Sequence, residues 1–212
     1  MRFISNVLAY RLTPKWWELE QDKRKSTIAE IFSILSDTKK SGNNTLKAEA
    51  YESLRYDCNI IVWLVVKNPK DAICIRAKLA KALGGYAKIK YGFLSVFESK
   101  SMGNNSKKDY FVAYPVSKSQ EWYLLDKGKQ SDIIMNHINM AKTDASNKGI
   151  NSYTTLSFGI DDGEFVVLYE LDSIPEWVDV TQHLRSANAH RWVVKESPIL
   201  VGWRGNFGAF VE

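Results

Sequence analysis

The stretch Asn59–Leu79, NIIVWLVVKNPKDAICIRAKL, contains a strand, a turn and a helix, and its pattern occurs twice in the chain. The second copy, Glu164–Leu184, reads EFVVLYELDSIPEWVDVTQHL and starts 105 residues later. Few residues are identical, but the apolar run, the turn with its proline and the following helical pattern keep their register. The sequence therefore predicts a duplicated fold.

Segments outside this stretch repeat at nearly the same spacing. Val7–Tyr10, VLAY, is matched by Phe111–Tyr114, FVAY, 104 residues later, and Trp17 is matched by Trp122. Chance similarity seldom keeps register across several elements, so we interpret the pattern as a true internal repeat.

Each half shows the order β-α-β-β-α-β, which is the ferredoxin-like motif. In the first half we expect strands Phe3–Tyr10, Leu46–Leu54, Ile60–Val66 and Ala87–Phe97, with helices Lys23–Leu35 and Lys70–Leu83. In the second half we expect strands starting at Tyr110 and spanning Ile150–Phe158, Glu164–Leu171 and Val193–Trp203, with helices ending near Ala141 and spanning Pro175–Ala189. The expected fold class is α+β. Two tandem ferredoxin-like repeats should pack their antiparallel sheets face to face and form a barrel-like core, with the helices outside. The repeats should cover residues 1–100 and 108–212, with the candidate pocket in the second and the polar connection Ser99–Lys108 between them.

Composition limits the class of protein. The 212 residues are 45% hydrophobic and 25% charged, which is ordinary for a soluble globular protein. The net charge of +5 favours anionic partners, and a polycarboxylate ligand fits it as well as nucleic acid does. Cys58 and Cys74 form no CxxC motif or disulfide framework, which favours a reducing cytoplasm. Since no signal sequence or long apolar run is present, we expect a cytoplasmic protein without a membrane span.

The two halves differ in chemistry within Asp109–Ala141. Lys118 and His137 have no basic counterpart in the first half, where Phe32 lies 105 residues before His137. Pro115 is expected to end the strand that carries Tyr114, and Ser131 or Asp132 to cap the following helix.

Helical periodicity places His137 on the buried face of that helix, beside the row Ile134, Ile138 and Ala141. An inward histidine near a tyrosine and a lysine is a candidate axial ligand for a flat cofactor. A core histidine bonded to a carbonyl oxygen is the alternative, as are a core aromatic for Tyr114 and a solvated turn residue for Lys118.

Other patterns carry less information. The glycines form neither a GxGxxG nor a GxxxxGK loop, and no HExxH, EF-hand or Ser-His-Asp pattern is present. Asp161–Gly163 is interpreted as a hairpin turn rather than a metal site. The ferredoxin-like order with basic charge also occurs in RNA-binding sheets, but Ile60–Val66 is uniformly apolar and lacks their aromatic pattern. Nucleic acid is therefore not expected as a partner.

Four segments in order resemble motifs of the chlorite dismutase family, and most closely those of its coproheme decarboxylase branch. They are Tyr110–Lys118 (YFVAYPVSK), Trp122–Leu125 (WYLL), Met135–His137 (MNH) and Gly159–Asp162 (GIDD), where the branch reads YPMSK, NWYML, an EHG histidine and GLDD. The resemblance is close over roughly the second half and extends to the first half by architecture. It implies paired ferredoxin-like repeats, assembly as a homopentamer, and haem b or coproheme (iron) held in the second repeat.

The resemblance also implies roles for individual residues. Tyr114 takes the place of the tyrosine that carries a radical to a propionate, and Lys118 that of the lysine assisting it. Arg185 matches a family arginine that could hold a propionate, or it is a surface charge of its helix. Ser152 stands at the distal position, which is arginine in chlorite dismutases and glutamine in many decarboxylases. Without a cation to hold an oxyanion over the iron, chlorite conversion is not expected.

The axial ligand of the iron falls on one of two residues. Counting forward from Trp122 places it on His137, and counting back from Gly159 places it on Asn139. A two-residue insertion within Lys142–Gly149 reconciles the counts, and helical periodicity favours His137.

The function implied is peroxide-dependent coproheme decarboxylation, with a porphyrin ligand and hydrogen peroxide as co-substrate. A haem-poor relative that serves as a structural, haem-carrier or sensor protein is the alternative, and Ser152 favours it. A metal-free monooxygenase of the same fold also stays open.

Overall fold

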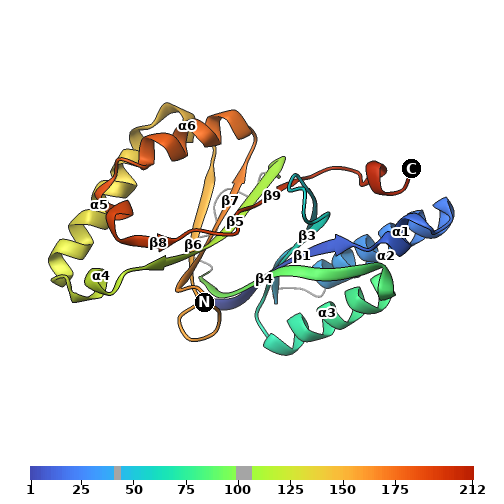
Figure 1. The fold of residues 1–212 in the computed structure, drawn as a ribbon. Helices are drawn as coiled ribbons and strands as arrows, with labels where there is room; N and C mark the ends of the chain where they lie inside the picture. Colours follow the sequence, from blue (N-terminus) through green and yellow to red (C-terminus); the bar gives the residue numbers. More distant parts are fainter. Residues whose placement is uncertain (41–43, 99–106) are drawn as a thin grey trace.

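The structure is a computed structural model that describes residues 1–40, 44–98 and 107–212. The first repeat contains β1 (Arg2–Leu12), α1 (Pro14–Trp17), α2 (Gln21–Lys40), β2 (Thr45–Ser53), β3 (Ile60–Val66), α3 (Pro69–Leu83), η1 (Gly84–Tyr86) and β4 (Ala87–Glu98). The second contains β5 (Tyr110–Lys118), α4 (Gln120–Leu124), α5 (Lys127–Thr143), η3 (Ala145–Asn147), β6 (Asn151–Leu156), β7 (Phe165–Leu171), α6 (Ile174–Leu184), η4 (Asn188–Trp192), β8 (Val193–Lys195), β9 (Leu200–Trp203) and η5 (Gly208–Phe210). Figure 1 shows the two sets of helices on opposite sides of the strands.

The strands form one closed antiparallel barrel. The order along the sheet is β7-β6-β4-β1-β3-β2-β9-β5-β8, and β7 also pairs with β5, which closes the ring. Each repeat has the ferredoxin-like strand order, β4-β1-β3-β2 in the first and β9-β5-β7-β6 in the second. Two short seams join the repeats, one where Val96 pairs with Leu156 and one where Glu52 and Ser53 pair with Trp203 and Gly202. The predicted fold class is therefore confirmed.

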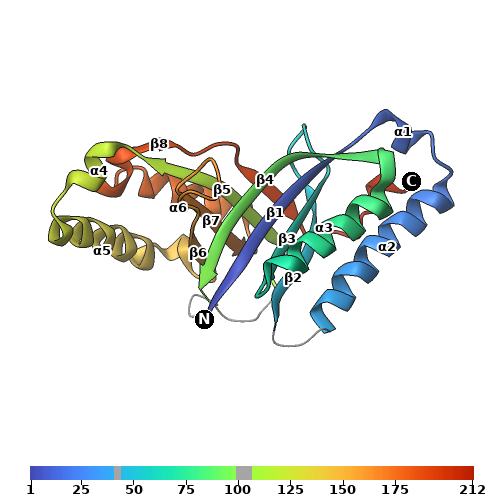
Figure 2. The ribbon, with the colours of Figure 1, turned by 90° about the horizontal axis from the view of Figure 1, so that it is seen from below.

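The uniformly apolar strand β3 is explained by burial on both of its faces. Ile61, Trp63 and Val65 point into the barrel interior, and the alternate residues of β3 pack under the helices of the first repeat. In Figure 2, α2 and α3 lie side by side over this outer face, while α5 and α6 lie at the other end of the molecule.

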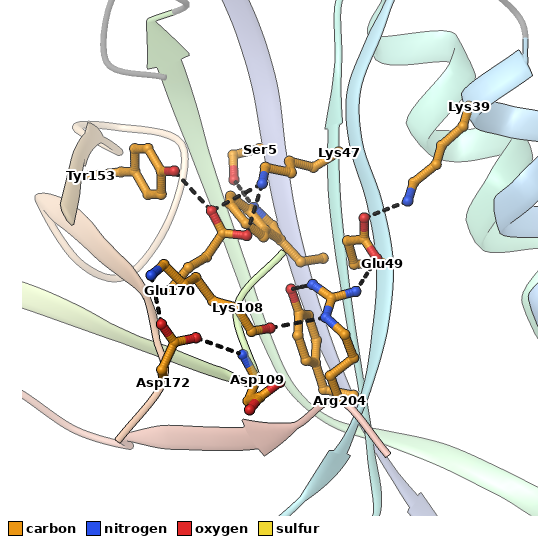
Figure 3. A network of polar contacts seen from close by, with 12 residues as sticks. Ser5, Lys39, Lys47, Glu49, Lys108, Asp109, Tyr153, Glu170, Asp172 and Arg204 are labelled. Atoms are coloured by element: carbon orange, nitrogen blue, oxygen red, sulfur yellow. Dashed lines mark hydrogen bonds and ion pairs between the residues drawn. The ribbon is translucent and has the colours of Figure 1, made fainter. Parts of the chain in front are cut away.

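A buried ion pair crosses the barrel between the repeats. Lys47 on β2 binds the Glu170 carboxylate on β7 at 2.8 Å and lies 5.1 Å from the ring centre of Trp63. Tyr153 donates to the same carboxylate at 2.8 Å (Figure 3). Glu170 is only 1% exposed, so its charge depends on these partners for compensation.

Two local predictions in the first part of the second repeat were wrong. Pro115 does not end its strand, because β5 continues to Lys118 and Pro115 pairs with Val166. On the opposite side of β5, pairing with β9 stops at Ala113 and pairing with β8 resumes only at Ser117, so no neighbouring strand requires the missing N–H group.

The start of α5 was also misplaced. Asp126 is its cap and accepts hydrogen bonds from Gly128 N and Lys129 N, whereas Ser131 and Asp132 lie within the helix.

The end of the chain departs most from the expected elements. Helix α6 ends at Leu184, and the expected final strand is broken into β8 and β9. The chain then crosses back to the first repeat, where Phe210 accepts a hydrogen bond from Trp16 Nε1 at 2.8 Å and Phe207 is buried. Figure 1 shows the C-terminus beside α1 and α2.

The local register of the repeat near Trp17 was offset by one residue. Trp17 is half exposed and its neighbour Trp16 is buried, so by burial the counterpart of Trp122 is Trp16. The proposed connection between the repeats falls largely on residues 99–106, which lie outside the described residues. Among the helices of the described ranges, none is long and apolar enough to cross a membrane.

The outer layers of the two repeats are packed differently. Under α2 and α3 a large cluster of buried side chains includes Phe207 from the C-terminal segment. Under α5 and α6 the corresponding cluster has only three buried members, Val112, Leu171 and Trp177. The difference leaves space in the second repeat.

Candidate functional site

A cavity of about 420 Å³ lies between the outer face of the second repeat's sheet and the segments α5, α6 and η4. Pockets for cofactors and small ligands usually fall in this size range. Its walls are largely apolar and include Val116, Trp122, Ile134, Ile138, Phe165, Val167, Trp177 and Leu184. Its polar lining is made of Tyr114, Lys118, His137, Thr154, Tyr169, Thr181, Arg185, His190 and Glu196.

Strand β5 supplies two of the predicted site residues because side chains alternate along a strand. Phe111 and Ala113 point into the barrel, so Tyr114 and Lys118 lie on the cavity side. The ring of Tyr114 stacks against that of Tyr169 on β7, with ring centres 6.1 Å apart. Burial raises the pKa of the Tyr114 hydroxyl well above its ordinary value, so the phenol keeps its proton.

Lys118 is held at the edge of the cavity. Its ammonium group donates to the carbonyl oxygen of Ala189 at 3.0 Å and lies 3.9 Å from the ring centre of Trp122. Burial lowers the pKa of Lys118, while the charges of Glu164 and Glu196 oppose that change. The lysine thus places a partly desolvated cation beside the cavity.

Helix α5 directs His137 into the cavity together with Ile134 and Ile138, one turn apart on the same face. Asn139, the alternative ligand, is exposed on the other side of the helix. Among the described residues, His137 Nδ1 is a buried polar atom without a hydrogen-bond partner. Burial, and next the charges of His190 and Lys118, lower the pKa of His137 and favour the neutral ring that binds metals.

The segment after α6 adds a polar cluster that sequence reasoning largely missed. Arg185 caps the end of α6, and its Nη1 lies 2.6 Å from Glu196 Oε2. His190 on η4 lies with its ring centre 6.4 Å from that of His137. Of these three, only Arg185 was predicted, because His190 and Glu196 follow no local periodicity. The only sequence signal for His190 is a weak one, the rarity of its residue type, because the chain contains only 3 histidines.

The predicted distal residue lies slightly away from the others. Ser152 is on β6 and is not among the residues that line the cavity, whereas Thr154, two residues later on the same face, is. Ser152 is instead the partner of Tyr169 across strands β6 and β7, and its side chain acts to lower the pKa of the Tyr169 hydroxyl, which burial raises. The structure therefore brings Tyr114, Lys118, His137 and Arg185 together and places Ser152 beside Tyr169, outside the cavity lining.

The donor set fits an iron porphyrin that carries propionates. A neutral, unpaired imidazole can ligate iron, the apolar walls can cover a flat ring, and Lys118 and Arg185 can pair with carboxylates. Within the described residues, no group of three or more histidine, cysteine or acidic side chains could hold a bare metal ion.

An α+β barrel of two ferredoxin-like repeats, with a cation-edged apolar cavity in the second, is the class of protein that the fold and the site define. A profile of the family described as chlorite dismutase matches residues 24–205. The chain belongs to the chlorite dismutase family.

Individual relatives agree with this membership. The coproheme decarboxylase of Mycolicibacterium smegmatis (strain ATCC 700084 / mc(2)155) is 28% identical over 96 residues, which are 45% of this chain and 40% of that protein. The match thus spans less than half of that curated relative. The crystal structure of TA0507, a protein assigned as a chlorite dismutase, is 35% identical, has a TM-score of 0.89 and covers 100% of this chain and 98% of its own.

More distant structures share the fold. A mutant chlorite dismutase from Candidatus Nitrospira defluvii is 17% identical with a TM-score of 0.84, covering 99% of this chain and 94% of its own. A heme-binding protein from Thermus thermophilus is 15% identical with a TM-score of 0.85 and the same coverage.

Proposed function

We propose that this protein binds an iron porphyrin through His137 and catalyses peroxide-dependent decarboxylation of coproheme. The observation that carries the proposal is the convergence of His137, Tyr114, Lys118 and Arg185 on one cavity, with the buried His137 Nδ1 left unpaired. The similarity to a coproheme decarboxylase supports the choice of ligand. By family resemblance the working form is a homopentamer, which a mass measurement in solution tests.

Each of the chain's own residues in the cavity would have a distinct role. When bound, the porphyrin iron supplies the activation of hydrogen peroxide. His137 holds the ligand from α5, and the apolar walls exclude water from it. Tyr114 releases an electron together with its proton, since its raised pKa disfavours a phenolate, and regains a hydrogen atom from a propionate. Lys118 and Arg185 pair with propionates and orient them. The propionate loses two electrons and its carboxyl group as carbon dioxide, while peroxide is reduced to water.

The first test is an absorbance titration with haem and with coproheme. Wild type, His137→Ala and Asn139→Ala are compared, because the histidine and asparagine side chains lie on opposite faces of α5. We expect a Soret shift that saturates at one ligand per chain, that is unchanged in Asn139→Ala, and that is lost or weakened at least about tenfold in His137→Ala. Absence of stoichiometric binding by the wild type would disprove the proposal.

The second test asks whether bound coproheme reacts. Peroxide is added to the coproheme complexes of the wild type and of Tyr114→Phe, and carbon dioxide and porphyrin products are measured. The wild type should release carbon dioxide, and Tyr114→Phe should lose at least about 100-fold of the rate while still binding the ligand.

A haem carrier or sensor is the second candidate function. The observation in its favour is that β6, which contributes Thr154 to the cavity lining and carries Ser152 at the predicted distal position, contains no arginine or glutamine. Stoichiometric binding without any peroxide-dependent decarboxylation would select this function.

A further inference from the structure

The cation-edged cavity contains an internal carboxylate. Among the described residues that line it, Glu196 is the one acidic side chain. It lies between β8 and β9 and is well covered, with 18% of its side chain exposed. No step of the proposed decarboxylation uses this carboxylate.

Glu196 is paired with the groups that a ligand carboxylate would use. Its Oε2 accepts from Arg185 Nη1 at 2.6 Å, and its Oε1 lies 3.7 Å from His190 Nδ1. His190 Nδ1 in turn lies 3.5 Å from Arg185 Nη1, so the three side chains form one cluster. Glu196 lines the cavity together with Lys118 and Tyr114, and its negative charge acts to raise the pKa of both groups.

A second carboxylate cannot share these cations without cost. Two carboxylates that compete for one guanidinium repel each other, and the one that is displaced must be solvated again. Arg185 is the more accessible partner, with 59% of its side chain exposed, so a ligand carboxylate can reach its guanidinium group and compete with Glu196 for it.

We propose that Glu196 is a specificity-determining residue that occupies the carboxylate subsite of Arg185 until a porphyrin carboxylate displaces it. This proposal rests on the proposed function and deepens it, because it names the part of the ligand that is recognised at Arg185, which is a carboxylate. Glu196 weakens binding of every ligand carboxylate at this subsite, and it pairs with Arg185 again once that carboxylate has left as carbon dioxide. The exchange therefore favours departure of the decarboxylated product over that of the substrate.

The test uses metal-free coproporphyrin III, which has four carboxylates, and its tetramethyl ester, which has none. Both are titrated by fluorescence in the same non-ionic detergent buffer, so iron ligation and turnover play no part. Glu196→Gln keeps the shape of the side chain and removes its charge. Asp179→Asn is the matched control, since Asp179 is an exposed residue of α6 outside the cavity lining.

We expect Glu196→Gln to bind coproporphyrin about fivefold more tightly than the wild type does. Its affinity for the ester, and the affinity of Asp179→Asn for either probe, should stay within about twofold of the wild type. In an Arg185→Gln background, adding Glu196→Gln should bring no further gain, because the contested cation is gone. Thermal unfolding of each variant verifies that it is folded.

Several results would overturn the inference. If Glu196→Gln binds coproporphyrin equally or more weakly while the wild type binds it, Glu196 positions Arg185 instead of competing for it, and the proposed function stands. An equal gain for the ester shows that the substitution merely enlarges the cavity. If neither the wild type nor Glu196→Gln binds coproporphyrin, the inference fails, whereas the proposed function is decided by the coproheme titration, in which His137 can ligate the iron.

Discussion

At the scale of single residues, Gly202 lies at one seam between the repeats, where there is no room for a larger side chain. A Cβ added to Gly202 would lie 2.6 Å from Tyr51 Cβ, and Tyr51 is fully buried and stacked on Phe111. Because neither side chain can move aside, Gly202→Ala should lower the free energy of unfolding by about 2–3 kcal/mol. Urea unfolding at neutral pH measures it.

Gly85 provides the comparison for Gly202. A Cβ added there meets nothing within 4 Å, so Gly85→Ala should change the unfolding free energy by less than about 0.5 kcal/mol. Equal effects of the two substitutions would show that crowding at the seam is not what makes Gly202 necessary.

At the scale of elements, the helix that carries His137 depends on a cap that its sequence pattern did not reveal. The Asp126 carboxylate accepts hydrogen bonds from Gly128 N at 2.8 Å and Lys129 N at 3.3 Å. Asp126→Ala should therefore cost about 1 kcal/mol of unfolding free energy. Asp132→Ala, at an exposed position inside α5, should cost less than about 0.5 kcal/mol. Chemical denaturation of both variants measures these losses. A larger loss in Asp132→Ala than in Asp126→Ala would show that Asp132 caps the helix, as the sequence suggested.

At the scale of the whole molecule, a charge network ties the end of the second repeat to the first. Arg204, just after β9, donates to Glu49 Oε2 on β2 at 2.6 Å and to the Tyr51 hydroxyl at 3.1 Å, while Lys39 from α2 binds the same glutamate (Figure 3). Burial alone would raise the pKa of Glu49, but the hydrogen bonds from Lys39 and Arg204 outweigh it and lower the pKa below the ordinary 4.5.

Because of this network, the stability of the folded protein should fall at acid pH. Because the folded-state pKa of Glu49 is lower than the unfolded value, the unfolded chain binds more protons, and stability falls as the pH drops through 4.5 toward the folded pKa. Glu49→Gln should lose about 1–3 kcal/mol at pH 7 and show a shallower further loss toward about pH 3 than the wild type. Urea unfolding at several pH values measures both slopes, and parallel slopes would contradict the assignment.

Much of the fold could be predicted because burial leaves a periodic mark on the local sequence. The unbroken apolar run of β3 reflects a strand covered on both faces, and the repeat spacing reflects two copies of one motif. The inward position of His137 followed from helical periodicity in the same way. These features depend on neighbours that are near in sequence, or on a duplication that the sequence itself displays.

The sequence by itself determined two ferredoxin-like repeats, the strand that holds Tyr114 and the helix face that holds His137. Only the tertiary structure decided where the barrel closes, why Pro115 is tolerated within β5, and that Glu196 shares the cavity with Arg185. The physical reason is that each of these depends on which distant segments become neighbours. Contacts across many residues leave no periodic pattern, because a side chain such as Glu196 is selected by the cation that the folded chain brings to it and not by the residues beside it in sequence.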